Sequence, residues 1–312
     1  MSITEKFLNS LHFPTEWRQI DRSEDKEIYC QTNRQKTLEE ALSVLESNCV
    51  RPNQNLYTKL LQKASQTNES AAKISALFSS IKKPTAHMYT TYIRAQSNRG
   101  EIDAVRAAFQ KAKRSGCADE IVYSVYIRAE AKAGNLKEMK EAFEEAKKNS
   151  LAIGSQAIYG ILTAQAAQAG DIKTMRSYYW EAVGKNIRID LSAIEAYITA
   201  EASAGHVDEV RKIFYEEERK GRYSPVLYGA ACMAEANAQN LKAVEFLYYE
   251  AKKRKMMSDV AVGFYMIAEG QAKNKRAVEQ AYGIAKKDSS LCTDVMEKGY
   301  EIANRNLKRK RE

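Results

Sequence analysis

The sequence predicts an all-α fold, a right-handed α-solenoid of stacked helix–turn–helix repeats of about 35 residues. The first observation is compositional: only four prolines and fourteen glycines occur among 312 residues, which favours helix throughout. The second is a series of positions spaced by 34 to 36 residues. Glycine occupies the first four positions of the series and is lost from the last two: Gly100, Gly134, Gly170, Gly205, Gln239 and Lys273.

At the N-terminus we expect a cap over residues 1–53 that includes a degenerate first repeat. Residues 1–36 are predicted to be irregular. Thr37 and Glu40 then have the spacing of a capping box. This spacing predicts a helix that starts at Leu38 and ends before Pro52.

Residues 54–293 are predicted to form seven repeats that share several columns. A tyrosine commonly lies eleven positions before the glycine, an aromatic residue nine positions after it, and an alanine three positions later, as in Tyr123, Gly134, Phe143 and Ala146. Glycine can close the first helix, because it accepts the left-handed backbone conformation found there. Two short helices cannot bury both of their apolar stripes alone, so the pairs are expected to stack.

The C-terminal region, residues 294–312, is predicted to be a capping helix over residues 294–308 with a basic tail, Lys308–Arg311. The formal net charge of the chain is +9, of which residues 1–53 carry −2 and the remainder +11. The basic character therefore belongs to the repeats, and it permits a polyanionic partner.

Several classes of function are disfavoured by the sequence. No run of eighteen apolar residues occurs, so no membrane partner is expected. There is no Gly-rich phosphate loop, no H-E-x-x-H and no cysteine–histidine metal spacing, so we expect no catalytic residues, metal site, cofactor or small-molecule substrate. The five cysteines form no C-x-x-C pair and are predicted to be reduced thiols. A cytoplasmic protein is expected, with the nucleus or an organelle as alternatives.

The repeats resemble pentatricopeptide repeats over roughly residues 38–293. The resemblance is carried by motifs such as Lys132-Ala133-Gly134-Asn135-Leu136 and Ala169-Gly170-Asp171-Ile172. When the tyrosine column is numbered as position 4, position 8 is never glycine, unlike the pattern of tetratricopeptide repeats. A tetratricopeptide-like or Sel1-like array is the alternative interpretation.

The resemblance implies binding of single-stranded RNA, at about one base per repeat. In the family, position 5 and the last residue of the repeat contact the base edge, and position 2 flanks the base. Carried over to this chain, the base-contacting pairs are Thr58 with Thr85, Thr90 with Asp119, Ser124 with Ser155, Gly160 with Asp190, Glu195 with Ser224, and Gly229 with Ser258. Only Thr90 with Asp119 resembles a base-reading pair of the family, one associated with guanine. At position 2, Ile121, Val226 and Val260 are the branched side chains suited to flanking bases, and Lys132 is the one basic residue at position 13.

An acidic row at position 11 opposes this interpretation. Its members are Glu130, Glu201, Glu235 and Glu269, and they are expected to form a solvent-facing ladder on the concave surface or to pair with neighbouring lysines. Exposed carboxylates there would repel RNA. The alternative function is therefore a scaffold that binds a protein partner on the concave surface. RNA processing or stability is the role expected if RNA is the partner.

Overall fold

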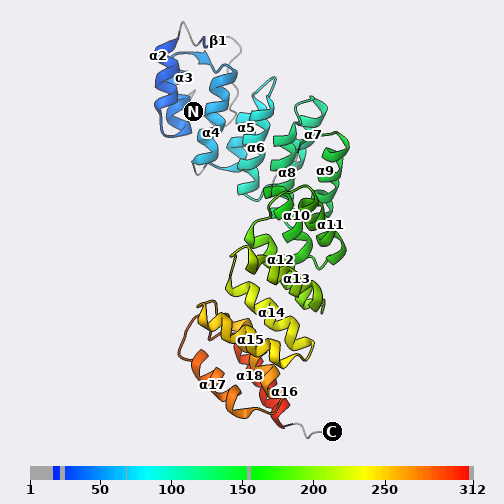
Figure 1. Cartoon of the computed structure of the whole chain (residues 1–312). Helices are drawn as coiled ribbons and strands as arrows, with labels where there is room; N and C mark the ends of the chain where they lie inside the picture. Colours follow the sequence, from blue (N-terminus) through cyan, green and yellow to red (C-terminus); the bar gives the residue numbers. More distant parts are fainter. Residues whose placement is uncertain (1–16, 22–24, 68, 153–155, 309–312) are drawn as a thin grey trace. The chain divides into compact units, whose positions relative to one another are not determined.

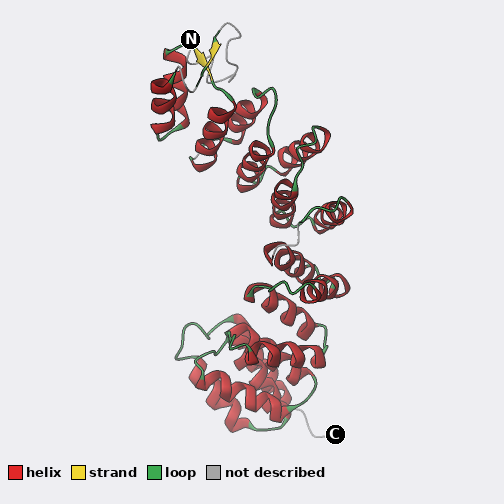
Figure 2. Ribbon diagram, turned by 45° about the horizontal axis from the view of Figure 1, so that its top comes forward, coloured by secondary structure: helices red, strands yellow, loops and turns green. Residues whose placement is uncertain are grey.

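The structure, a computed structural model, describes residues 17–21, 25–67, 69–152 and 156–308 and divides into two compact units, residues 1–158 and 159–312 (Figure 1). The described part contains seventeen helices and one pair of two-residue strands. Figure 2 shows that helix predominates and that the strands lie near the N-terminus. The predicted all-α repeat fold is confirmed.

Unit 1 begins with the strand pair and continues as helix pairs. Its elements are β1 Arg18–Gln19, α2 Lys26–Arg34, α3 Leu38–Ser47, β2 Val50–Arg51, α4 Gln54–Gln66, α5 Ala71–Ser79, α6 Ala86–Asn98, α7 Ile102–Arg114, α8 Glu120–Lys132 and α9 Leu136–Lys148. The strands are parallel and pair Arg18 with Val50. Within the unit, α6 packs on its own partner α7 and on α8, the first helix of the next repeat.

Unit 2 holds the later helix pairs and a single last helix. Its elements are α10 Gln156–Gln168, most of which lies in this unit, α11 Ile172–Gly184, α12 Leu191–Ser203, α13 Val207–Arg219, α14 Pro225–Asn237, α15 Leu241–Lys253, α16 Asp259–Gln271, α17 Lys275–Ala285 and α18 Asp294–Lys308. First helices again pack on one another, α12 on α14 and α14 on α16. α18 occupies the place of a first helix after α16.

The expectation that residues 1–36 are irregular is wrong for Lys26–Arg34, which form α2. Only Ile28, Tyr29 and Cys30 of its nine residues are apolar, and tertiary contacts help to decide its structure. α2 packs on α3, and Thr32 is fully buried. Just before the helix, the Arg18 guanidinium donates a 2.6 Å hydrogen bond to the Asp25 carboxylate. Residues 1–16, 22–24 and the tail residues 309–312 lie outside the described part of the chain.

The turn between the two helices of a repeat has the same geometry whether or not glycine is present. Gly134 has φ +75°, and at the positions where the series loses glycine Gln239 has φ +58° and Lys273 φ +66°. Two residues are thus held in the left-handed region, at a cost that glycine does not have. The backbone N–H after each turn residue donates back to the carbonyl of position 11, for example from Asn135 to Glu130 at 2.9 Å.

Aromatic side chains join each second helix to the next first helix. The Phe109 ring lies 3.8 Å from Tyr126 in a stacked arrangement and 4.9 Å from Tyr123 edge-on. The same stacking recurs between Tyr248 and Tyr265, at 3.9 Å. The tyrosines at position 7 therefore pack between repeats, as their spacing predicts, and they are not available to stack on a ligand.

The prediction that the position-11 glutamates form a solvent-facing ladder is wrong. Glu130, Glu201, Glu235 and Glu269 are all buried, none of them more than 5% exposed. Three of them receive two hydrogen bonds each from an arginine on the preceding second helix, over 2.6 to 3.0 Å: Arg106 to Glu130, Arg176 to Glu201 and Arg211 to Glu235. Position 11 follows positions 4 and 8 on the apolar stripe, so the carboxylate faces the repeat interface.

Burial alone would raise the pKa of Glu130, but hydrogen bonds from Arg106, Tyr126 and Asn135 outweigh it and leave the pKa lowered. Glu269 differs, because position 245 is a glutamate where α7, α11 and α13 have arginine. Burial raises the pKa of Glu269, and the nearby Glu245 carboxylate raises it further, against hydrogen bonds from Tyr265 and Asn274 that lower it. One repeat interface therefore buries a carboxyl group without an arginine.

The last helix, α18, closes unit 2 by unusually near contact with α16. A Cβ atom added to Gly299 would lie 2.6 Å from the Cα of Gly263. A Cβ added to Gly270 would lie 2.7 Å from the Ala303 carbonyl oxygen. Only glycine permits backbones to approach so closely. In the described residues, no helix is long and apolar enough to cross a membrane.

The strain at Gln239 yields a stability prediction. Replacing Gln239 with glycine removes the left-handed strain, so the free energy of unfolding should rise by about 1 kcal/mol. The reciprocal change, Gly134→Ala, introduces the same strain and should lower it by a similar amount. Urea denaturation followed by circular dichroism measures both. Equal stability of Gln239→Gly and the parent chain would refute the assigned strain.

The Glu245–Glu269 contact yields a prediction on pH. Because the pKa of Glu269 is raised in the folded state, folding takes up a proton, and this contribution to stability is lost as pH rises through the folded pKa. Stability should therefore increase at this site as pH falls from 7 toward the ordinary value of 4.5. Glu245→Arg should abolish that increase and stabilise the protein at pH 7 by about 1–3 kcal/mol.

The control for this experiment is Glu279→Arg. Glu279 occupies the equivalent position of α17 and is exposed, and the residue of α18 in the position of Glu269 is Ala303. The variant makes the same change of charge, but the new arginine has no buried carboxyl group to pair with. Urea midpoints measured from pH 5 to 7.5 should change slope for Glu245→Arg alone, and parallel curves for both variants would rule out the contact.

Candidate functional site

We name positions 2, 6, 9 and 13 of each first helix the first-helix stripe; Val125, at position 6 of α8, is its buried member in unit 1. Steps of four, three and four residues place these positions on one side of a helix. In α4 they are Asn55, Lys59, Gln62 and Gln66; in α6, His87, Thr91, Arg94 and Asn98; in α8, Ile121, Val125, Arg128 and Lys132. A ligand that runs across successive repeats would meet this stripe.

In unit 1 the first-helix stripe is basic. Lys59, Arg94, Arg128 and Lys132 are all exposed, and no carboxylate occupies a stripe position of α4, α6 or α8. Neither Arg94 nor Arg128 has an ion-pair or hydrogen-bond partner within the described part of the chain. The Lys132 ammonium donates a long hydrogen bond, 3.4 Å, to the Asn98 amide oxygen. These charges are accordingly available to a polyanion.

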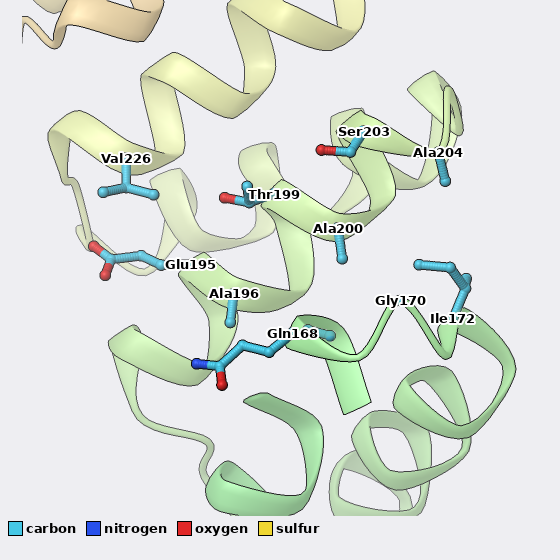
Figure 3. A pocket seen from close by; sticks show the side chains of 11 residues that line it. Gln168, Gly170, Ile172, Glu195, Ala196, Thr199, Ala200, Ser203, Ala204 and Val226 are labelled. Carbon is cyan, nitrogen blue, oxygen red and sulfur yellow. The ribbon is translucent and has the colours of Figure 1, made fainter. Parts of the chain in front are cut away.

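In unit 2 the first-helix stripe is almost uncharged and partly apolar. A cavity of about 520 Å³ opens on it, lined by α10, α12 and the start of α14. Figure 3 shows Glu195, Thr199 and Ser203 of α12 along this cavity, with Val226 beside Glu195. The carboxylate of Glu195 is the one charge in the lining, so the two units offer chemically different faces.

The last residue of a repeat is the N-cap of the next first helix. The Asp119 carboxylate accepts hydrogen bonds from the Ile121 and Val122 amides, at 3.1 and 2.9 Å. Asp190 accepts from Ala193 at 2.8 Å, and Thr85, Ser224 and Ser258 cap in the same way. A polar residue at this position is thus required by helix capping, whatever else it binds.

The structure brings some of the predicted pairs together. A Cβ atom added to Gly160 would lie 2.8 Å from the Asp190 carboxylate oxygen, and one added to Gly229 would lie 2.8 Å from the Ser258 hydroxyl. At these positions glycine leaves room for the capping side chain, which is why no larger residue is present. Position 5 and the last residue are therefore neighbours across a repeat interface.

Thr58 and Thr85 lie together in the lining of a cavity of about 620 Å³ in unit 1. Asn55, Lys59 and His87, residues of the first-helix stripe, line the same cavity. The Thr58 hydroxyl donates to the Gln54 carbonyl at 3.1 Å and keeps its lone pairs for another donor. This predicted pair thus borders an open, cationic cavity.

The remaining predicted residues vary in accessibility. Thr90 is 6% exposed, and its hydroxyl donates to the Ala86 carbonyl at 3.0 Å, so little of it faces a ligand. Ser124 donates to the Glu120 carbonyl, and its predicted partner Ser155 lies outside the described residues. Ile121 and Val226, predicted to flank bases, are 53% and 43% exposed. Large aliphatic side chains with that exposure leave apolar surface for a ligand to cover.

Three basic stripe residues escaped the sequence-based prediction. Lys59, Arg94 and Arg128 lie at positions 6 and 9, whereas phosphate-binding residues were sought at position 13 alone. Arg94 and Arg128 are separated by 34 residues, which is the repeat period, so their alignment was a readable signal. The described residues contain no group of three His, Cys, Asp or Glu side chains that could hold a metal ion.

Comparison with known proteins bears on the fold and on one repeat. Residues 121–151, which cover most of α8 and α9, match the family model of the PPR repeat, the pentatricopeptide repeat. Comparison with the curated proteins finds no match. In this pair of helices Ile121, Arg128 and Lys132 belong to the first-helix stripe.

Solved structures of similar fold include the pentatricopeptide repeat protein PPR10 in complex with an 18-nt psaJ RNA element, with a TM-score of 0.67 and 15% identity over 87% of this chain. A cysteine-to-serine variant of PPR10 in complex with the same element gives the same values. PPR10 from maize gives a TM-score of 0.56 and 13% identity over 85% of this chain. This chain spans about 40% of the length of the PPR10 chains in the RNA complexes and 43% of the maize structure.

A likeness to solved structures at this low sequence identity shows the fold and does not show which ligand the chain binds. The matched repeat supplies the evidence at the level of sequence, and the TM-scores supply it at the level of architecture. Residues 121–151 therefore match a pentatricopeptide repeat, and the chain shares the fold of solved pentatricopeptide-repeat structures.

Proposed function

We propose that this chain binds single-stranded RNA along the first-helix stripe of unit 1. The observation that carries the proposal is the basic row of Lys59, Arg94, Arg128 and Lys132, exposed on three successive first helices. Phosphate contacts of this kind supply most of the affinity of proteins for nucleic acids. The RNA complexes of PPR10, whose fold this chain shares, support the same class of ligand.

The buried glutamates no longer oppose RNA binding. Their carboxylates lie inside the repeat interfaces, and in unit 1 the Glu130 charge is matched by Arg106 at 2.8 Å. A compensated, buried charge adds little to the field at the surface. Exposed Ile121 can flank a base while Arg128 and Lys132, about two and three turns further along α8, reach phosphates.

A protein partner is the second candidate, and the observation that favours it is the first-helix stripe of unit 2. That stripe is nearly uncharged, and its cavity combines the aliphatic side chains of Ile172 and Val226 with the Glu195 carboxylate. Such a lining suits an apolar peptide side chain beside a basic one. Retention of a protein by a chain that retains no RNA would favour this candidate over the first.

The basic row yields a prediction on salt dependence. The triple variant Arg94→Ala, Arg128→Ala and Lys132→Ala removes three phosphate contacts, so the slope of log affinity against log salt should fall by about 2. Affinity for an unstructured RNA at 0.1 M salt should fall at least tenfold. Fluorescence anisotropy titrations at several salt concentrations measure both quantities.

The matched control removes three exposed basic side chains from second helices, with Lys111→Ala, Arg114→Ala and Lys148→Ala. It changes the net charge equally and leaves the first-helix stripe intact. Its slope should stay close to that of the parent chain. Equal losses in both triple variants would mean that RNA responds to net charge and not to this surface.

Asp119 yields a separate prediction, because its carboxylate both caps α8 and is the predicted reader of a base. Asp119→Ala should lower the free energy of unfolding by about 1 kcal/mol through loss of the cap. Asp119→Ser keeps a capping hydroxyl and removes the carboxylate, so it should keep most of the stability. If Asp119 reads a base, the serine variant should alter the preference among RNA sequences, measured by selection from a random pool. An unchanged preference would leave Asp119 with a capping role alone.

A further inference from the structure

Two second helices of unit 2, α13 and α15, expose aromatic side chains beside basic ones. On α13 these are Lys212, Tyr215 and Arg219, and on α15 they are Lys242, Phe246 and Tyr249; we name the six residues the second-helix strip. Tyr215, Phe246 and Tyr249 are 45%, 57% and 56% exposed, although aromatic side chains are usually buried. The spacings of three and four residues place each set on one face of its helix.

The strip is ordered and positively charged. The buried Phe214 ring contacts Tyr215 edge-on at 5.6 Å, and Tyr248 contacts Tyr249 in the same way at 5.3 Å, so both rings are held from beneath. Lys212 lies 3.8 Å from the centroid of the Trp180 ring on α11. The strip itself carries three cations and no carboxylate.

Four carboxylates near the strip form ion pairs with cations that do not belong to it. Glu216 pairs with Lys220, and both Glu218 and Glu250 pair with Arg254 at 3.3 Å. Asp208, one turn before Lys212, pairs with Arg211 at 3.1 Å. None of these pairs uses Lys212, Arg219 or Lys242, so the cations of the strip remain available to a ligand.

The repeat itself supplies a comparison within the same chain. In unit 1 the positions equivalent to the strip are Ala107, Gln110 and Arg114 on α7 and Lys137, Glu141 and Glu144 on α9. They include no aromatic side chain, and their charges cancel. Repeat architecture thus does not require the aromatic and basic residues. In unit 2 the preceding second helix, α11, also has an aromatic residue, Trp180, at the position of Tyr215 and Tyr249.

We propose that the second-helix strip of unit 2 is a binding surface for single-stranded nucleic acid, distinct from the first-helix stripe. Aromatic rings on which bases stack, beside cations that contact phosphates, form the usual platform for single strands. Tyr215 and Phe246 each have a cation of the strip one helical turn away, so a base and its phosphate can be engaged together there. The inference extends the proposed function to a second surface and does not depend on the first.

Two other occupants fit less well. Protein interfaces are depleted in lysine, whereas two of the three cations here are lysines. A second copy of the chain would place like charges face to face, because a symmetric dimer apposes the same patch on both subunits. A flexible polyanion with planar bases satisfies both the rings and the charges.

The test uses the full chain and a labelled oligouridine of about 20 nucleotides, long enough for several stacked bases. The triple variant Tyr215→Ala, Phe246→Ala and Tyr249→Ala should weaken binding at least tenfold, by about the loss of three stacking contacts. Because the three side chains are exposed, thermal unfolding should stay unchanged. Ultraviolet crosslinking to the parent chain should map to these residues.

The control variant changes the equivalent positions of unit 1, Gln110→Ala, Glu141→Ala and Glu144→Ala, and should not weaken binding. If the aromatic triple variant binds with parental affinity and the crosslinks are confined to the first-helix stripe, the second-helix strip is refuted as a binding surface. The proposed function then stands. The converse, in which the aromatic variant alone loses affinity, would keep the strip and overturn the proposed site. No binding by the parent chain, or binding of a protein to the strip while oligouridine is ignored, would overturn the inference as well.

Discussion

In four first helices, α8, α12, α14 and α16, a carboxylate is buried at position 11 of the repeat interface. In the best example Glu130 accepts two hydrogen bonds from Arg106 of the preceding repeat and one from the Asn135 side chain at the turn. Its backbone carbonyl also accepts the N–H that closes the same turn. One residue thus links two repeats to the turn between helices. An unpaired carboxylate would be costly to bury, so the arginine fixes how the repeats stack.

The repeat columns explain why so much of the fold could be predicted. Glycine spacing alone located the turns, and the left-handed conformations of Gln239 and Lys273 show that the geometry persists where the glycine signal ends. The prediction that Glu130 faces solvent was wrong, because it gave the charge of the side chain more weight than its place in the helical period. Positions 4, 8 and 11 share one face, so Tyr123 and Ile127 already put Glu130 in the interface. α2 was beyond prediction, because packing on α3 stabilises it and its own pattern is weak.

The candidate site was less predictable, because several demands overlap at the same residues. Asp119 matches a base-reading position, yet helix capping alone explains a polar residue there. Gly160 reads as a missing base contact, yet it makes room for the Asp190 carboxylate. Where residue type does not show whether a side chain can contact a ligand, its exposure does. Arg94 and Arg128 gain importance only because the structure shows them exposed, and because Glu130, two residues after Arg128, is buried.

The end of unit 2 shows how a repeat array tolerates the loss of its own rules. Around α15 and α16 the turn glycine is replaced by Gln239 and Lys273, and the interface arginine by Glu245. Each change costs stability by a separate mechanism, strain in one case and a buried carboxyl group in the other. The same end of unit 2 holds the close approach of α18 to α16 at Gly263, Gly270 and Gly299, a backbone separation that glycine permits. Terminal repeats bury one face against a cap, so they are freed from matching a further repeat and can depart from the consensus.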